Sequence, residues 1–146
     1  MKGAKKETTE ETSRRMSKVR HFDTAPELAV QDALRGLGLQ FRANDKELPG
    51  RPDVVLPESK QVIFIHGCFW HGHVGCKRAK RPKTNVDFWN KRIDGNIARD
   101  RRVQDMLGSL GWKVSVLWEC QLRDPVSTQH LLATHVCLNN ELEGLE

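Results

Sequence analysis

Side chains that bind metals or transfer protons are concentrated in residues 66–76, directly after an apolar run at residues 62–65. The segment reads His-Gly-Cys-Phe-Trp-His-Gly-His-Val-Gly-Cys. Thiolates and imidazoles are ligands that zinc prefers, and imidazole also exchanges protons near neutral pH. A hydrophobic core has no use for this mixture. The segment therefore predicts a metal site, further histidines for proton or phosphate chemistry, and an aromatic wedge.

Three residues of this segment, Cys68, His73 and Cys76, have the spacing of ligands to a single zinc ion. Cys120 follows another predicted strand and is the expected fourth ligand, an inference from topology. Three thiolates and one imidazole form a closed tetrahedral set, which is typical of a structural zinc site. The alternative is that these residues are unrelated. Cys137 lies in an apolar stretch and is expected to be a buried free thiol.

His66 and His71 remain for chemistry once zinc has its ligands. Asp53 begins one predicted strand and His66 ends the next, so adjacent antiparallel strands would bring both to the same end of a sheet. Nucleases commonly place an oxygen ligand for Mg²⁺ beside a proton-transferring group. The pattern Pro-Asp…(Asp/Glu)-x-Lys has this shape, but Phe64 and His66 replace its second carboxylate and its lysine. Mg²⁺ would then rely on Asp53, a backbone carbonyl, phosphate oxygens and water. The alternative for Asp53 is a cap at a turn or strand start.

The elements that must hold these residues follow from capping signals and hydrophobic periodicity. Thr-Ala-Pro-Glu at 24–27 resembles a capping box at a helix start, and glycines at 36 and 38 end that helix. Extended segments are expected at 39–42, 53–56, 62–65 and 112–118, a long helix at about 86–110, and a final helix from Ser127 or Thr128. The order helix, three strands, helix, strand, helix predicts a single α/β domain with a mixed central sheet flanked by helices.

The length of 146 residues suits one globular domain. Residues 1–20 are polar and basic and are expected to be disordered in isolation, with residues 21–146 forming the domain. No apolar run approaches the roughly 20 residues that cross a bilayer, and no secretion signal is visible. We therefore expect a cytoplasmic protein in which the cysteines are ligands or free thiols, not disulfides.

Positive charge is concentrated between residues 77 and 102, where Lys and Arg far outnumber Asp. A basic stretch beside a candidate site suggests a polyanion partner, because phosphate contacts gain affinity from counterion release. The alternative is a solvated helix face. The candidate phosphate contacts lie in the loop after the histidines and cysteines: Lys77, Arg78, Lys80, Arg81 and Lys83.

With these residues in view, the chain resembles the very short patch repair (Vsr) mismatch endonucleases over about residues 13–123. The matching motifs are Ser-Arg-Arg-Met-Ser-Lys-Val-Arg at 13–20, Thr-Ala-Pro-Glu at 24–27, Leu-Pro-Gly-Arg-Pro-Asp at 48–53, His-Gly-Cys-Phe-Trp-His at 66–71, Phe-Trp at 88–89, Arg-Asp-Arg-Arg at 99–102 and Trp-Glu-Cys at 118–120. The resemblance implies a restriction-endonuclease-like fold and a Mg²⁺-dependent nick in duplex DNA beside the T of a T·G mismatch. It also implies a monomer at the bacterial nucleoid that starts very short patch repair, with other repair proteins following.

The resemblance also implies roles for individual residues. Asp53 would bind Mg²⁺ with help from the Ile65 backbone carbonyl, His71 would be the general base oriented by Asp100, His66 would contact the scissile phosphate, and Glu27 would hold metal-bound water. Glu27 has an equally good alternative as a capping residue, and Asp100 as a partner in a salt bridge on its helix.

Four apolar residues match those that the family inserts into the duplex: Met16, Phe69, Trp70 and Trp89. A mispaired step costs less to unstack, and aromatic faces replace the lost stacking. The alternative is a core role, which suits Trp89 best. The basic loop would contact phosphates without reading bases. Two other functions stay open: a zinc-stabilised DNA-binding domain without catalysis, and a Pro-Asp-type nuclease with another target.

Overall fold

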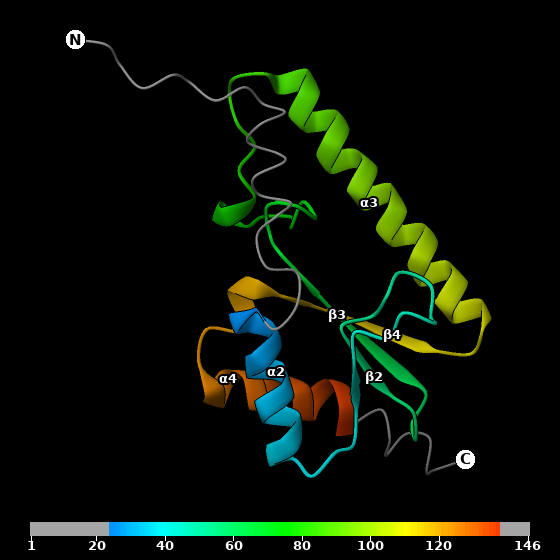
Figure 1. Ribbon diagram of the computed structural model, residues 1–146. Coiled ribbons are helices and arrows are strands. Elements are labelled where there is room, and N and C mark those ends of the chain that lie inside the picture. The colour runs from blue at the N-terminus through cyan, green and yellow to red at the C-terminus, as the bar shows by residue number, and fades with distance from the viewer. Residues whose placement is uncertain (1–23, 138–146) are drawn as a thin grey trace.

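The computed structural model describes residues 24–137, which fold as a mixed sheet with helices on both faces (Figure 1). The elements are α2 (Ala25–Gly36), β1 (Arg42–Ala43), β2 (Val54–Leu56), β3 (Gln61–His66), the 3-10 turn η1 (Lys77–Ala79), α3 (Val86–Ser109), β4 (Lys113–Trp118), the 3-10 turn η2 (Glu119–Gln121), α4 (Pro125–Leu132) and the π-helical turn η3 (Ala133–Cys137). Met16, the rest of the predicted basic N-terminal segment and the acidic C-terminal end lie outside the described residues. Within the described part, no helix is both long and apolar enough to cross a membrane.

The sheet has the strand order β1-β2-β3-β4. The pairs β1–β2 and β2–β3 are antiparallel, and β3–β4 is parallel, with Gln61 opposite Lys113 and His66 opposite Trp118. The parallel pair needs a crossover, and α3 supplies it. The predicted mixed α/β architecture is confirmed.

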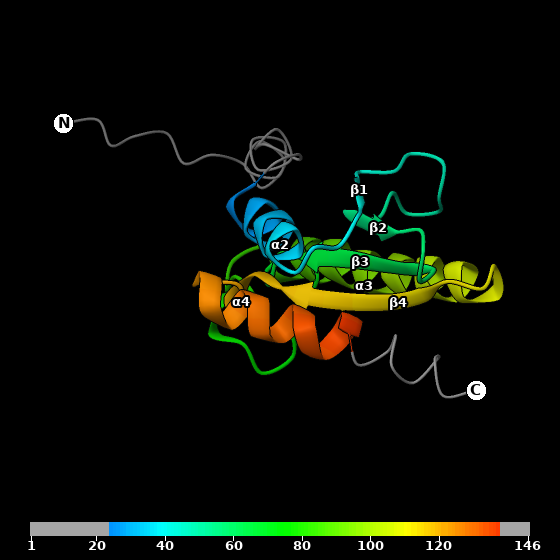
Figure 2. The ribbon, with the colours of Figure 1, turned by 90° about the horizontal axis from the view of Figure 1, so that it is seen from below.

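The side chains of the strands alternate between two hydrophobic clusters, one on each face of the sheet. On one face, α2 and α4 pack together over Val54, Ile63 and Leu117. On the other face, α3 packs through Leu107 against Val55, Val62 and Phe64 (Figures 1 and 2). The two middle strands, β2 and β3, are therefore buried on both faces, which explains the continuous apolar run at residues 62–65.

Two element boundaries differ from the sequence-based expectations. The predicted extended segment at 39–42 pairs only at Arg42–Ala43, because Leu39 and Phe41 pack against the first cluster without joining the sheet. Helix α4 begins at Pro125, ahead of the expected Ser127. The Asp124 carboxylate accepts a hydrogen bond from the Ser127 backbone N–H at 2.8 Å, and proline suits the first helical turn.

Candidate active site and metal centre

The alternation of the strands brings the candidate catalytic residues to the α3 face of the sheet. His66 has the same parity as Val62 and Phe64 on β3, and Asp53 has the same parity as Val55 on β2. Helix α3 covers this face and contributes Asp100. A cavity of about 220 Å³ results, lined by Gly50, Arg51, Asp53, Phe64, Ile65, His66, His71, Arg99, Asp100 and Val103. Asp53 and His66 therefore lie at the same end of the sheet as predicted, and His71 and Asp100 line the same cavity.

Asp53 carries the most strongly perturbed carboxyl group of this cavity. Its Oδ2 accepts a hydrogen bond from the Ile65 backbone N–H at 2.6 Å. Burial, together with the negative charge of Glu27, nevertheless raises the pKa of Asp53 to about 7, against the lowering effects of the Ile65 N–H and His71. Two acidic groups that share a water-poor site repel each other and favour a bound cation.

Glu27 lies in the first turn of α2. Its backbone N–H donates to the Thr24 hydroxyl at 3.4 Å, so the helix N-terminus is capped as predicted. Its side chain is buried, with the residue only 6% exposed, and its charge acts on Asp53. The observed cap is made by the Thr24 side chain to the Glu27 backbone, so the capping and site roles of the Glu27 side chain both stay predictions. The oxygen-rich pair of Glu27 and Asp53 suits Mg²⁺, which prefers carboxylate and water ligands.

The two histidines form a stacked pair beside Asp100. The imidazole rings of His66 and His71 lie 3.9 Å apart between centroids and only 8° from parallel. His71 Nδ1 is 2.6 Å from Asp100 Oδ2, whereas His66 Nε2 is 4.0 Å from Asp100 Oδ1. Burial, with a further contribution from His71, lowers the pKa of His66 to about 4, so this ring is neutral at physiological pH.

This arrangement favours a proton-transferring dyad over a metal chelate. The donor atoms of His66, His71 and Asp100 lie close enough for a metal ion. Parallel rings, however, direct their in-plane lone pairs side by side, and Asp100 already accepts the short hydrogen bond from His71. When Nδ1 of His71 donates to a carboxylate, Nε2 keeps the lone pair that accepts a proton.

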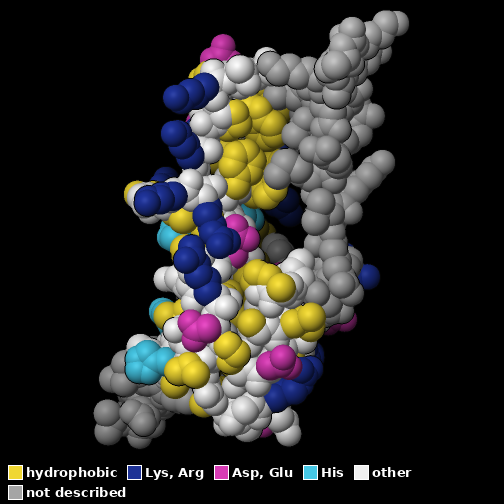
Figure 3. All heavy atoms as spheres, turned by 90° about the vertical axis from the view of Figure 1, so that its left-hand side faces the viewer, with side chains coloured by type: hydrophobic (Ala, Val, Ile, Leu, Met, Phe, Trp, Pro, Cys, Tyr) yellow, Lys and Arg dark blue, Asp and Glu magenta, His cyan; other side chains and the backbone are white. Residues whose placement is uncertain are grey.

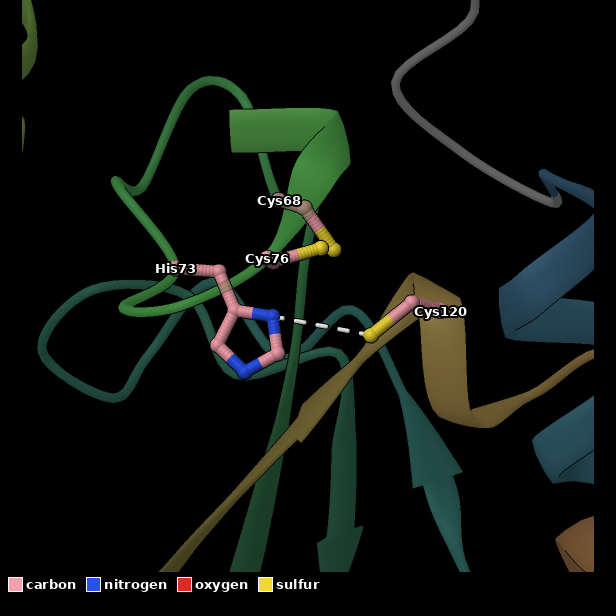
Figure 4. A group of neighbouring side chains, drawn as sticks. All are labelled: Cys68, His73, Cys76 and Cys120. Carbon is pink, nitrogen blue, oxygen red and sulfur yellow. Dashed lines mark hydrogen bonds between the residues drawn. The ribbon is translucent and has the colours of Figure 1, made fainter. Parts of the chain in front are cut away.

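The predicted zinc ligands converge at the ends of two parallel strands (Figure 4). His66 and Trp118 are paired, so Cys68 and Cys120 each follow two residues after the last pair of the parallel ladder. The loop after β3 turns back and adds His73 and Cys76. The four ligand atoms all lie within 4.8 Å of one another, and His73 Nδ1 is 3.5 Å from the Cys120 sulfur.

The donor set fits zinc. Tetrahedral zinc with sulfur ligands requires donor atoms roughly 4 Å apart. Burial, with hydrogen bonds from the neighbouring thiols, raises the pKa of Cys68 to about 12, so a cation is needed to keep this thiol ionised. Gly72 permits the turn of the loop: its φ is +61°, and a Cβ there would lie 2.7 Å from Ile97 Cδ1 on α3.

The expected wedge aromatics form one cluster with Phe88. The ring centroids of Phe69 and Trp70 are 5.3 Å apart, and Trp89 lies 5.6 Å from Phe69 and 6.0 Å from Trp70. Trp89 is buried, as the core interpretation expected, whereas Phe69 and Trp70 are only partly buried. Trp89 thus packs against the two partly buried rings of the loop, and the Asn96 amide donates to the Trp70 carbonyl at 3.0 Å.

The predicted phosphate contacts divide into two groups. Arg81 donates to Asn90 at 2.9 Å and to Asp94 at 2.8 Å, so it ties the basic loop to α3. Arg78 lies 3.9 Å from Glu119. Lys77, Lys80 and Lys83 are exposed, and within residues 24–137 no ion pair engages them. Figure 3 shows a face on which Lys and Arg side chains line the edge of a hydrophobic area.

Sequence reasoning assigned no role to several residues at these sites. Arg51 and Arg99 line the same cavity as Asp53 and His71. Trp118 stacks on His73 and lies edge-on to His66, and the Glu119 carboxylate accepts from the Cys68 backbone N–H at 3.3 Å. All four belong to motifs that carried the resemblance, so their motif membership was the available signal.

Comparison with known proteins agrees with this geometry. Residues 4–78 match the family model described as DNA mismatch endonuclease Vsr. The chain is 48% identical over 111 residues to the DNA mismatch endonuclease Vsr of Escherichia coli K12, covering 76% of this chain and 70% of that protein. It is 47% identical over 109 residues to the type II nicking enzyme V.XorIIP of Xanthomonas oryzae pv. oryzae (75% and 79% covered). It is 44% identical over 117 residues to the type II nicking enzyme V.NmeAIP of Neisseria meningitidis (80% and 83% covered).

Proposed function

The chain belongs to the family of the DNA mismatch endonuclease Vsr, and from this premise we propose that it nicks one strand of duplex DNA beside the T of a T·G mismatch. The reaction is Mg²⁺-dependent hydrolysis of a phosphodiester bond and starts very short patch repair. Zinc has a structural role. The restriction-endonuclease-like fold of the family agrees with the mixed sheet and its helices.

The observation that carries the proposal is the cavity on the α3 face. It holds the buried carboxyl group of Asp53, on which the charge of the buried Glu27 acts, together with a histidine that is hydrogen-bonded to a carboxylate. A domain that only bound DNA would gain nothing from burying two like charges, because that arrangement costs stability and repels phosphate. A metal-dependent hydrolase, in contrast, needs both a metal ligand and a base in the same cavity.

Each of these residues has a separate role in the proposed reaction. Bound Mg²⁺ supplies charge stabilisation at the phosphoryl oxygens. Asp53 would hold the metal with the Ile65 carbonyl, and Glu27 would hold a water molecule beside it. His71 Nε2 accepts the proton of the attacking water, while Asp100 fixes the tautomer and stabilises the imidazolium that forms. His66, neutral and buried, contacts the scissile phosphate as a hydrogen-bond donor.

Recognition would rest on the surfaces on either side of the cavity. Phe69 and Trp70, supported by Trp89, enter the weakened step at the mismatch. Lys77, Lys80 and Lys83 bind the phosphate backbone without reading sequence, with Arg78 and Arg81 beside them. Residues 1–20, with Met16 as an inserting residue, order on the DNA. The partner is duplex DNA at the nucleoid, and the protein acts as a monomer before other repair proteins take over the nick.

The test is incubation with end-labelled duplexes that carry a T·G mismatch, a correct pair at the same position, or another mismatch. Each duplex is tested with Mg²⁺ and with no divalent cation. We expect a single nick beside the T, in the T·G duplex only, and only with Mg²⁺. Equal cleavage of the paired duplex would instead support a nuclease with another target.

The matched variant is Asp53→Asn, which removes the metal ligand and keeps the side-chain shape. We expect it to bind the T·G duplex as wild type does and to leave it uncut. Binding without cleavage by the wild-type protein under all conditions would favour the non-catalytic DNA-binding function.

A further inference from the structure

Four aromatic rings form a continuous series that begins at the predicted zinc ligand His73 and ends at the proposed base His71. The indole of Trp118 stacks on the imidazole of His73, with centroids 4.1 Å apart and 8° between planes. The same indole meets His66 edge-on at 5.2 Å and 78°. His66 in turn stacks on His71 at 3.9 Å, and His71 is hydrogen-bonded to Asp100. Trp118 is therefore the one side chain of this series that touches both a predicted zinc ligand and a predicted catalytic residue.

The backbone fixes Trp118 in this position. It is the last residue of β4 and pairs with His66, the last residue of β3, so the two side chains emerge next to each other on the α3 face. The Trp118 backbone N–H donates to the Gln121 side chain at 3.0 Å, which closes the turn η2. That turn also directs Glu119 to the Cys68 N–H and Cys120 to the zinc ligands.

A histidine that binds a metal is usually oriented by a hydrogen bond to its second ring nitrogen. His73 directs Nδ1 toward Cys120, and among residues 24–137 no hydrogen bond is made at its Nε2. A parallel indole at 4.1 Å restricts the plane of the ring in place of such a bond. The edge contact with His66 restricts the catalytic pair in the same way.

We propose that Trp118 is a positioning residue that couples the zinc centre to the catalytic histidines, holding the ring planes of His73 and His66 at once. The part that concerns catalysis rests on the proposed nicking function. On this view the zinc centre fixes the place of Trp118, and Trp118 fixes the plane of His66 on which His71 stacks. Misplacing a reacting group by about 1 Å costs on the order of 100-fold in rate.

The variant Trp118→Leu removes the flat face and keeps an apolar side chain. Trp118 also borders a hollow of about 590 Å³, so the smaller side chain leaves room that is already open to solvent. Trp118→Phe keeps an aromatic face and is the conservative variant. Trp112→Leu is the matched control, because Trp112 precedes the opposite end of β4 and packs against the hydrophobic cluster on the α3 face.

Zinc release is the first measurement and needs no nicking activity. Zinc transfer to an excess of a chromogenic chelator is followed for each variant. We expect Trp118→Leu to release zinc roughly tenfold or more faster than wild type, in the range known for residues that orient a metal ligand. Trp118→Phe and Trp112→Leu should stay close to wild type. Equal release rates for Trp118→Leu and wild type would overturn the contact with His73 as an orienting device.

Single-turnover nicking of a T·G duplex by zinc-loaded protein is the second measurement. We expect the rate constant of Trp118→Leu to fall between roughly 10- and 100-fold, with DNA affinity and the amplitude of the reaction unchanged. A merely destabilised protein would lose amplitude and keep its rate constant. Trp118→Phe should restore the rate constant to within a few-fold of wild type.

A double-variant cycle with His66→Ala identifies the route of the effect. If Trp118 acts through His66, adding Trp118→Leu to His66→Ala lowers the rate constant little further. Fully additive losses, or an unchanged rate constant in Trp118→Leu, would refute the coupling to catalysis. If wild-type protein nicks no duplex, the proposed function fails, and the zinc-release measurement still decides the contact with His73.

Discussion

We predict that the buried carboxyl group of Asp53 destabilises the folded protein when no cation is bound, by an amount that depends on pH. Its carboxyl group has a pKa of about 7 in the fold, against an ordinary value of 3.8. A carboxyl whose pKa is raised on folding releases its proton more readily in the unfolded chain. Folding therefore loses stability as the pH rises from the unfolded pKa to the folded one, and the loss is complete above the folded pKa.

The variant Asp53→Asn removes this dependence, because the amide is uncharged and still accepts the Ile65 N–H. Each pH unit between the two pKa values costs about 1.4 kcal/mol. Wild type should thus be destabilised relative to the variant by about 2 kcal/mol near pH 5.5 and by about 4 kcal/mol near pH 8.5. The gap in free energy of unfolding widens by about 2 kcal/mol over this range, or about 6 °C in Tm for a chain of this size.

The assay is thermal unfolding of zinc-loaded protein without Mg²⁺, with wild type and variant compared at each pH. The exposed acid Asp105 on α3 provides the control variant Asp105→Asn, whose difference from wild type should stay small at every pH. A second variant, Glu27→Gln, removes the repelling charge and should lower the pKa of Asp53. The difference in free energy of unfolding between Glu27→Gln and the double variant with Asp53→Asn should therefore depend less on pH. Adding Mg²⁺ should narrow the gap between wild type and Asp53→Asn, since the ion stabilises ionised Asp53.

A gap between wild type and Asp53→Asn that stays constant from about pH 5.5 to about pH 8.5 would refute the reasoning. So would a gap that narrows as the pH rises. Either result would mean that the carboxyl of Asp53 is already ionised and compensated without a metal, and that burial beside Glu27 does not prepare the site for a cation.

Three further predictions concern the metal centre and the DNA-binding surface. Cys120→Ser should lose its zinc on dialysis and unfold at a lower temperature, whereas the control Cys137→Ser should keep its zinc. Elemental analysis measures the zinc content, and a full complement of zinc in Cys120→Ser would contradict the four-ligand set. Trp70→Ala should nick T·G and paired duplexes at similar low rates, because alanine cannot replace the lost base stacking. If the variant preferred the mismatched duplex as strongly as the wild-type protein does, the wedge role of Trp70 would be ruled out. The double variant of Lys80 and Lys83 to Ala should reduce the slope of log affinity against log salt by about 2 without changing mismatch preference, and an unchanged slope would remove both from the phosphate contacts.

Local signals in the sequence were sufficient for most elements of the fold. Thr24 and the following Pro26 located the start of α2, and the apolar run at 62–65 located a strand buried on both faces. The start of α4 was placed too late because Ser127 resembles a cap, whereas Asp124 followed by Pro125 caps the helix in the structure. The segment at 39–42 has strand-like alternation, but its apolar residues Leu39 and Phe41 are partly buried by packing against the hydrophobic cluster under α2 and α4 instead of by joining the sheet.

The sequence by itself determined the family to which this protein belongs and which of its residues are candidates for chemistry. Cys68, His73 and Cys76 are close along the chain, so their spacing alone predicts a shared ligand role, and the motif around His71 points to one family. Only the tertiary structure decided how these groups act together. The parallel pairing of β3 and β4 brings Cys120 to the other ligands and Trp118 between His73 and His66. The burial that gives Asp53 and His66 their unusual pKa values depends on α2 and α3 closing over the sheet, because desolvation is set by neighbours that are distant in sequence.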